Sequence, residues 1–152
     1  MSRFQIAYAV TIDRPVDEVF RILALPEDLE RVLRLSPMVV SFGLLGVKPG
    51  STKDEQVITF EFGERVYSNE ITMRVEQTVD SESRRVDYWS QTKSGVPITV
   101  HKVRTFEDVG GATKVSELID GEAPFGVHLL ARRTARSAHV EHMESYHRLF
   151  ED

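Results

Sequence analysis

Residues 66–121 read VYSNEITMRVEQTVDSESRRVDYWSQTKSGVPITVHKVRTFEDVGGATKVSELIDG. Apolar and polar residues alternate through most of this stretch, and short clusters of Asp, Ser, Lys and Gly interrupt the alternation. Period-two alternation is typical of strands with one buried face, and such clusters are typical of hairpin turns. The stretch therefore predicts four consecutive antiparallel strands, at residues 66–79, 84–92, 96–106 and 112–121.

Working outward from this stretch, the same alternation predicts three earlier strands, at residues 3–12, 38–47 and 53–62. Between the first two of these, apolar residues recur at helical spacing from Val16 to Leu23. Pro26 ends that helix, and residues 27–35 form a second short one. Residues 124–150 contain no helix breaker after Gly126, so they predict one long C-terminal helix.

These elements predict an α+β fold of one domain, residues 1–152. A seven-stranded, curved antiparallel sheet would wrap around the long C-terminal helix, with two short helices between strands one and two. The chain length fits a single core.

The turn positions predict which strand residues lie opposite one another and share a face. We place the four hairpin turns at Gly63-Glu64 and at residues 80–83, 93–95 and 108–111. Representative pairs are Phe60 with Tyr67, Val75 with Tyr88, Ser90 with Ile98, Arg104 with Val115, and Lys102 with Glu117. All four registers place the apolar-rich residues on one inner face: Ile58, Phe60, Ile71, Met73, Val75, Val86, Val100, Phe106, Val115 and Ile119.

The predicted inner face also carries many polar residues, which a dry core does not tolerate without partners. They are Gln56, Tyr67, Asn69, Gln77, Tyr88, Ser90, Lys102, Arg104 and Glu117. Either they lie at sheet ends in water, or the face encloses a wet or ligand-filled cavity. The C-terminal helix presents the small residues Ala131, Thr134, Ala135 and Ala138 to the sheet. These leave room for a cavity, or they let helix and sheet approach closely; we favour the cavity.

We predict that this cavity binds a small ligand. Its predicted lining comprises Phe60, Tyr67, Asn69, Ile71, Met73, Tyr88, Ser90, Ile98, Val100, Lys102, Arg104, Glu117, Val127, Leu130, Ala131, Thr134 and Ala138. Tyr67, Asn69 and Ser90 either bind the polar end of a ligand or form a solvated rim. Lys102, Arg104 and Glu117 form either an anion anchor or acid–base group, or a salt bridge that closes the far end; we favour the salt bridge.

Composition and motifs argue against several other classes of protein. The net charge of -5, without a basic stripe, argues against nucleic-acid binding. The chain has no cysteine, no signal-peptide pattern and no apolar run long enough to span a membrane, so we expect a cytoplasmic location. His139 and His142 have a spacing that permits shared metal ligation, but no further ligands accompany them. We therefore predict a solvated helix face there, with no metal and no cofactor.

Two segments resemble the START-like (SRPBCC) superfamily, which has the helix-grip fold. They are TIDRPVDEVF at residues 11–20, where the first strand leads into a helix, and FEDVGGATKV at residues 106–115 in the last hairpin. The superfamily includes plant pathogenesis-related allergens, lipid-transfer START domains and polyketide cyclase/aromatase-like proteins. The resemblance implies a cavity between sheet and helix, with its mouth near Gly63-Glu64, residues 93–95 and residues 125–130. It does not assign a substrate.

Three functional hypotheses follow. The first is a binding protein for a small, mostly apolar ligand such as a lipid, an isoprenoid or a polyketide-like chain. The second is a cyclase, aromatase or dehydratase acting on a polyketide-like substrate, with Tyr88, Arg104 or Glu117 handling protons or polarising a carbonyl. The third is an interaction module that uses the outward Trp89, predicted to lie opposite Arg74. This third hypothesis predicts a homodimer or another protein complex without a ligand.

Overall fold

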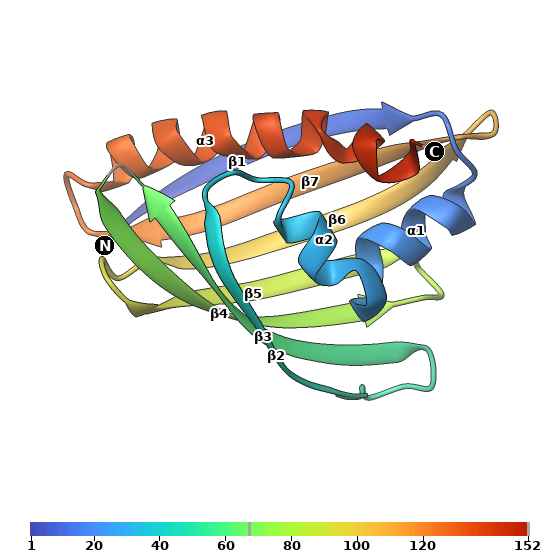
Figure 1. Cartoon of the computed structure of the whole chain (residues 1–152), viewed down its shortest axis with the longest axis horizontal. Helices are drawn as coiled ribbons and strands as arrows, with labels where there is room; N and C mark the ends of the chain where they lie inside the picture. Colours follow the sequence, from blue (N-terminus) through green and yellow to red (C-terminus); the bar gives the residue numbers. More distant parts are fainter. Residues whose placement is uncertain (67, 152) are drawn as a thin grey trace.

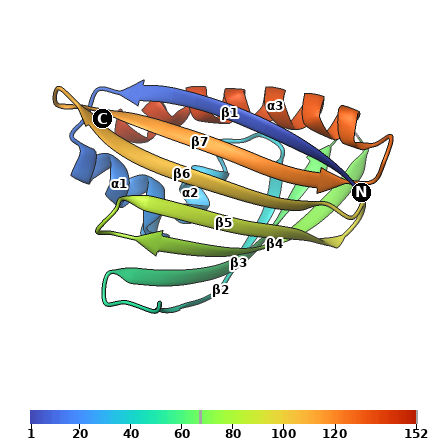
Figure 2. The same ribbon diagram turned by 180° about the vertical axis from the view of Figure 1, so that it is seen from behind.

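A computed structural model describes residues 1–66 and 68–151. These residues form a seven-stranded antiparallel sheet with the order β1-β7-β6-β5-β4-β3-β2 (Figures 1 and 2). The strands are β1 (Ser2–Ile12), β2 (Val39–Pro49), β3 (Glu55–Val66), β4 (Asn69–Asp80), β5 (Arg85–Ser94), β6 (Thr99–Val109) and β7 (Ala112–Ala123). The predicted α+β architecture is confirmed.

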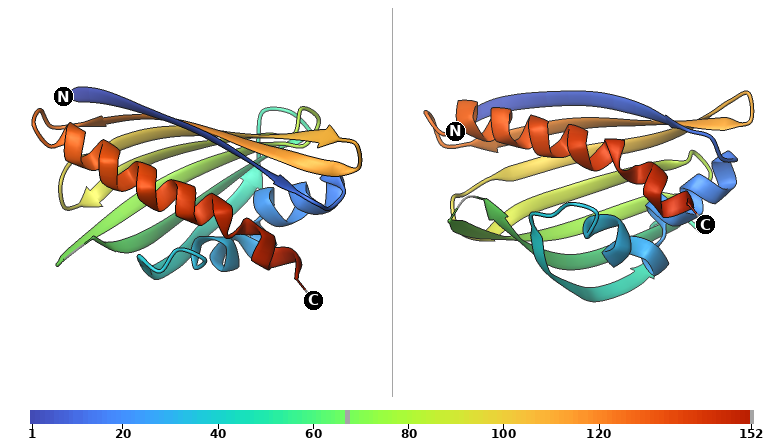
Figure 3. Two further views of the ribbon diagram at one scale, coloured as in Figure 1. Left: turned by 90° about the horizontal axis from the view of Figure 1, so that it is seen from above. Right: turned by 45° about the horizontal axis from the view of Figure 1, so that its top comes forward.

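The helices lie on one side of the sheet, as Figure 3 shows. They are α1 (Val16–Ala24), the 3-10 helix η1 (Pro26–Asp28), α2 (Leu29–Leu33), α3 (His128–Glu144) and the 3-10 helix η2 (Tyr146–Phe150). The long α3 runs beside β1, and the Tyr8 hydroxyl donates a hydrogen bond from β1 to Glu144. Within the described residues, no helix combines the length and the apolar character needed to cross a membrane.

The C-terminal helix is shorter than its sequence pattern predicts. Gly126 adopts a φ of 87° in the turn that precedes α3, so the helix begins at His128. At the other end, the Ser145 hydroxyl donates to the His142 carbonyl at 2.6 Å, and the chain continues as η2. Such a local side-chain bond competes with regular helix geometry and explains the break.

The predicted turn at Gly63-Glu64 is wrong. Both residues lie inside β3, which pairs with β4 as far as Val66 opposite Asn69. A Cβ atom at position 63 would overlap the Ser41 side chain of β2, its cross-strand partner. This glycine therefore marks a close approach between two strands rather than a turn.

The other three predicted registers are also displaced, by two positions each. Val75 lies opposite Ser90, and Ser90 lies opposite Val100. In the last hairpin, Gly110 and Gly111 have φ angles of 72° and 92° and form a two-residue turn, where a four-residue turn was predicted. Apart from the register shift at Thr72 and Ser94, these displacements are even, so the described strand residues keep their predicted faces.

The main apolar core lies at the end of the sheet that α1, α2 and η2 cover. It contains residues with almost no exposed surface from all these elements, including Val19, Val32, Ile58, Phe60, Val79 and Tyr146. A second, smaller cluster of Phe4, Ile6, Ile119 and Ala123 packs near Ala135 of α3. The core is thus concentrated at one end, and the sheet under the first half of α3 is less densely covered.

We expect Gly121→Ala to lower the free energy of unfolding by about 1–3 kcal/mol. Gly121 lies opposite Phe4, and an added Cβ would overlap that buried ring. Urea denaturation measures the effect. Gly43→Ala in β2 is the matched control because nothing lies within 4 Å of its would-be Cβ. Equal stabilities of the two variants would contradict the prediction.

Candidate functional site

A buried arginine organises the middle of the inner face. The Arg104 Nε donates to Glu117 Oε2 at 2.7 Å, directly across the β6–β7 hairpin. Its Nη1 donates to the Leu23 carbonyl and to the Tyr88 hydroxyl, both at 2.6 Å, and its Nη2 donates to the Tyr146 hydroxyl at 2.8 Å. Four of the five guanidinium N–H groups are therefore bound by groups from α1, β5, β7 and η2.

Part of the polar inner face serves to cap α1. The carbonyls of Leu23 and Ala24 lie in the last turn of that helix, where they have no partner within the helix. Arg104 binds the first, and the Gln77 side chain donates to the second at 2.8 Å. These two inward polar residues thus have a structural role at the end of α1.

Glu117 is fully buried and ionised. Its Oε2 accepts bonds from Arg104 and, at 2.6 Å, from the Tyr146 hydroxyl. Burial opposes the charge, but the cations Arg104 and Lys102 and the hydrogen bond from Tyr146 outweigh burial and hold the pKa of this carboxyl well below its usual range. Its other oxygen, Oε1, lies 3.5 Å from Lys102 Nζ and 3.5 Å from His139 Nε2.

The bases around Glu117 have lowered pKa values. Burial lowers the pKa of Lys102 to about 8, although Glu117 raises it. Burial also lowers the pKa of His139 to about 4, so this imidazole is neutral at pH 7. His142, which hydrogen-bonds the Val32 carbonyl at 2.8 Å, likewise has its pKa lowered to about 4 by burial.

Three buried side-chain atoms of the inner face have no hydrogen-bond partner: Gln77 Oε1, Glu117 Oε1 and His139 Nε2. The last two lie 3.5 Å apart in the polar cluster. Buried polar atoms are normally satisfied, because each unmade bond costs about 1–3 kcal/mol. The pair therefore points to a group that the protein itself does not supply.

Beyond this polar cluster, the inner face is only half covered. Several inward side chains toward the first half of α3 are half-buried: Ile71, Met73, Ser90, Ile98, Val100 and Lys102. By contrast, inward residues under α1 and η2, such as Ile58 and Val86, are completely buried. The sheet thus has an open, mostly apolar inner surface next to the polar cluster.

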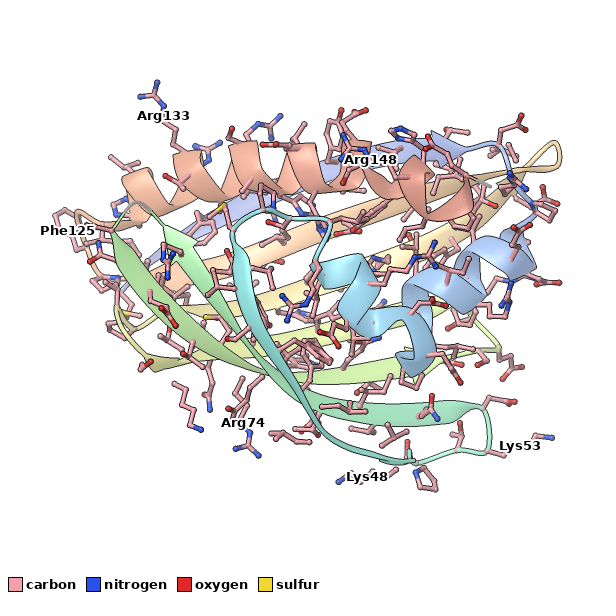
Figure 4. The ribbon with its side chains drawn as sticks, in the orientation of Figure 1. Lys48, Lys53, Arg74, Phe125, Arg133 and Arg148 are labelled. Carbon is pink, nitrogen blue, oxygen red and sulfur yellow. The ribbon has the colours of Figure 1, made fainter. Side chains whose placement is uncertain are left out.

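Two grooves reach the surface of the described structure. One, of about 430 Å³, lies between α3 and the α2–β2 connection and is lined by Pro37, Met38, Thr134 and Ala138, among others. The other, of about 700 Å³, lies on the outer face of the sheet around Trp89. Figure 4 shows Arg74 pointing away from the sheet on that outer side.

The outer groove is the larger, but both of its arginines are paired within the protein. Arg74 pairs with Glu61 at 3.6 Å, and Arg3 pairs with Asp120 at 3.7 Å. The two orphaned atoms belong to the inner face. We therefore take the inner face as the candidate site.

Comparison with known proteins finds similarity at the level of structure. No family model matches the chain, and no curated protein matches it. The Zhui aromatase/cyclase from Streptomyces sp. R1128 has 13% sequence identity and a TM-score of 0.72, over 95% of this chain and 92% of its own. A START superfamily protein from Mycobacterium smegmatis has 11% identity and a TM-score of 0.69, over 93% and 92%. Ara h 8.0201 has 13% identity and a TM-score of 0.64, over 95% and 98%.

The chain has a START-like fold. This agrees with the resemblance carried by residues 11–20 and 106–115. In this START-like structure, the first of these segments forms the exit from β1 and the start of α1, and the second spans the β6–β7 turn.

In this START-like fold, the predicted lining residues are buried, half-buried or exposed. Tyr88, Arg104 and Glu117 are buried together in the polar cluster, and Phe60 is buried in the main core. Half-buried are Ile71, Met73, Ser90, Ile98, Val100, Lys102, Thr134 and Ala138. Asn69 and Val127 are exposed. Tyr67 lies outside the described residues, and the side chains of Leu130 and Ala131 also lie outside the described part.

Sequence reasoning missed two members of the polar cluster. His139 was assigned to a solvated helix face, but it is buried against Glu117. Tyr146 is absent from the predicted lining, although its hydroxyl binds both Arg104 and Glu117. The helical spacing of His139, four residues from both Ala135 and Met143, was the available signal that it faces inward.

The predicted pairing of Trp89 with Arg74 is also wrong. Because the β4–β5 register is displaced by two, Trp89 lies opposite Glu76. Its ring stacks on His101, with centroids 3.6 Å apart. Trp89 does face outward as predicted, with 54% of its surface exposed.

Proposed function

We propose that this START-like domain binds a small, mostly apolar molecule on the inner face of its sheet, beneath the first half of α3. The observation that carries the proposal is the row of half-buried inward side chains next to a completely buried core. Small-molecule sites combine an apolar wall with a few placed polar groups. Here Ile71, Met73 and Val100 supply the wall, and Lys102, Glu117 and His139 supply the polar groups.

The groove between α3 and the α2–β2 connection supports the proposal because two small residues of the predicted lining, Thr134 and Ala138, border it. The Zhui protein of similar fold is described as an aromatase/cyclase, an activity that acts on a small molecule. A lipid, an isoprenoid and a polyketide-like chain each fit the apolar wall.

An enzyme of the polyketide cyclase, aromatase or dehydratase type is the second candidate function. The observation that favours it is a neutral imidazole, His139, beside a carboxylate in a buried site. Tyr88 has its pKa raised to about 12 by burial and is thus a protonated hydroxyl, not a base. In this hypothesis Arg104 and Glu117 hold the site in place, and His139 is the group that exchanges a proton with the substrate.

Native mass spectrometry of the purified protein, followed by extraction of any bound compound, tests ligand binding directly. Titration with the neutral probe N-phenyl-1-naphthylamine tests where the ligand site lies. We expect Ser90→Trp to weaken probe binding at least about tenfold, because Ser90 faces the open inner surface and a buried indole would fill it. Gln91→Trp is the matched control, since Gln91 directly follows Ser90 in β5 and its side chain therefore lies on the opposite, outer face.

Three outcomes separate an inner ligand site, an outer ligand site and an interaction module. Loss of binding in Ser90→Trp alone supports an inner ligand. Loss in Gln91→Trp alone contradicts the inner site and favours the outer groove. A protein that carries no small molecule, binds no probe and forms a dimer or complex favours the interaction module with Trp89.

A further inference from the structure

The two unpartnered atoms of the polar cluster define a specific acceptor and donor arrangement. Glu117 Oε1 and His139 Nε2 are 3.5 Å apart and form no hydrogen bond with each other. The side chains are 0% and 8% exposed, so bulk solvent does not satisfy them. Lys102, next to them, keeps 20% of its side chain exposed, so the cluster borders the open inner surface.

The chemistry of each atom is defined by its neighbours. Glu117 is held as a carboxylate by Arg104 and Lys102, and a carboxylate only accepts hydrogen bonds. His139 Nε2 faces the carboxylate oxygen Glu117 Oε1, an acceptor, which favours the neutral tautomer with the proton on Nε2. That nitrogen then donates one hydrogen bond. A single oxygen that accepts from His139 and donates to Glu117 therefore satisfies both atoms at once.

We propose that this site binds the hydroxyl group of an otherwise apolar ligand, which accepts a hydrogen bond from His139 Nε2 and donates one to Glu117 Oε1. The inference rests on the proposed ligand-binding function and adds the functional group that the ligand must carry. A phenol, an enol and an aliphatic alcohol share this chemistry.

Other functional groups leave one of the two atoms unsatisfied. A ketone or an ether accepts from His139 but donates nothing to Glu117. A carboxylate places a second negative charge beside Glu117 Oε1. A hydrocarbon leaves both atoms without a partner, and sites built around a hydroxyl reject analogues that lack it because their own polar groups then remain unpaired.

The test compares four probes of one shape: 2-naphthol, 2-methoxynaphthalene, naphthalene and 2-naphthoic acid. Their fluorescence or the heat of binding gives the dissociation constant for the intact protein. We expect 2-naphthol to bind at least about tenfold more tightly than 2-methoxynaphthalene, since bonds to charged groups are the stronger ones. Naphthalene and 2-naphthoic acid are expected to bind more weakly than 2-naphthol.

Variants connect this preference to the site. His139→Leu is expected to remove most of the advantage of 2-naphthol over 2-methoxynaphthalene, and His139→Gln, which restores a donor, is expected to recover part of it. His147→Leu is the control, because His147 lies exposed in η2, beyond the end of α3. Thermal unfolding of each variant confirms that it is folded before binding is measured.

The outcomes distinguish the inference from the proposed function. Equal affinities for the three neutral probes would mean that water satisfies both atoms, and this would overturn the inference while leaving ligand binding intact. If 2-naphthoic acid binds most tightly, the inferred hydroxyl site is wrong and Lys102 instead anchors an anion. If none of the probes binds and the native mass spectrum shows no bound compound, the proposed function itself is wrong.

Discussion

Replacing Arg104 with methionine is expected to lower the free energy of unfolding by about 3–5 kcal/mol. The substitution keeps an apolar chain of similar length but leaves the buried Glu117 carboxylate without its closest cation. It also removes the donors to the Leu23 carbonyl and to the hydroxyls of Tyr88 and Tyr146. Each of these groups is buried, so water replaces the lost bonds poorly. Urea denaturation followed by circular dichroism measures the change.

Two further variants show whether the orphaned charge causes the loss. Arg85→Met removes an arginine that pairs with Asp87 at the surface, and it should cost less than about 1 kcal/mol. The double variant Arg104→Met, Glu117→Met removes both buried charges and should be more stable than Arg104→Met alone. An Arg104→Met protein within about 1 kcal/mol of the wild type would show that Glu117 is protonated or solvated, contrary to the structure.

Stability is expected to fall by about 2 kcal/mol as the pH is lowered from 6 to 5. Burial lowers the pKa of both His139 and His142 to about 4 in the folded protein, against an ordinary value of 6.5. In this window the unfolded chain binds a proton at each position and the folded protein does not. Each histidine therefore contributes up to about 1.4 kcal/mol per pH unit, and acid favours unfolding.

The carboxyl groups with shifted pKa values leave the direction of this pH effect on stability unchanged. Burial raises the pKa of Glu64, which favours the folded state on acidification, but one such group does not offset two histidines. Glu117 and Asp87 have lowered pKa values, so the stability they contribute is lost only at lower pH, near and below their ordinary values. The window between pH 6 and 5 thus reports mainly on the histidines.

Urea denaturation at half-unit pH steps measures this dependence. His139→Leu is expected to reduce the slope between pH 6 and 5 by about half, because one of the two titrating groups is removed. His147→Leu, at an exposed position, should keep the wild-type slope. A wild-type protein with constant stability across this window would contradict the burial of the two imidazoles.

The face of each strand residue could be predicted because period-two alternation depends only on neighbours in the chain. The turn at Gly63-Glu64 and the four-residue turn before β7 were both wrong, yet the resulting displacements were even and left every side chain on its predicted face. The predicted cross-strand partner of each residue was more sensitive to these register errors. Arg104 lies directly opposite Glu117, where the predicted register put Val115.

The sequence by itself determined the order of the elements, the inward and outward faces of the sheet, and the presence of charged residues on the inner face. These follow from local spacing and turn residues. Only the tertiary structure decided what those charges bind. Leu23 is 81 residues from Arg104 in the chain, and Tyr146 is 42 residues from it. They meet the guanidinium, and His139 is buried beside Glu117, only because α1, α3 and η2 pack against the same face of the sheet.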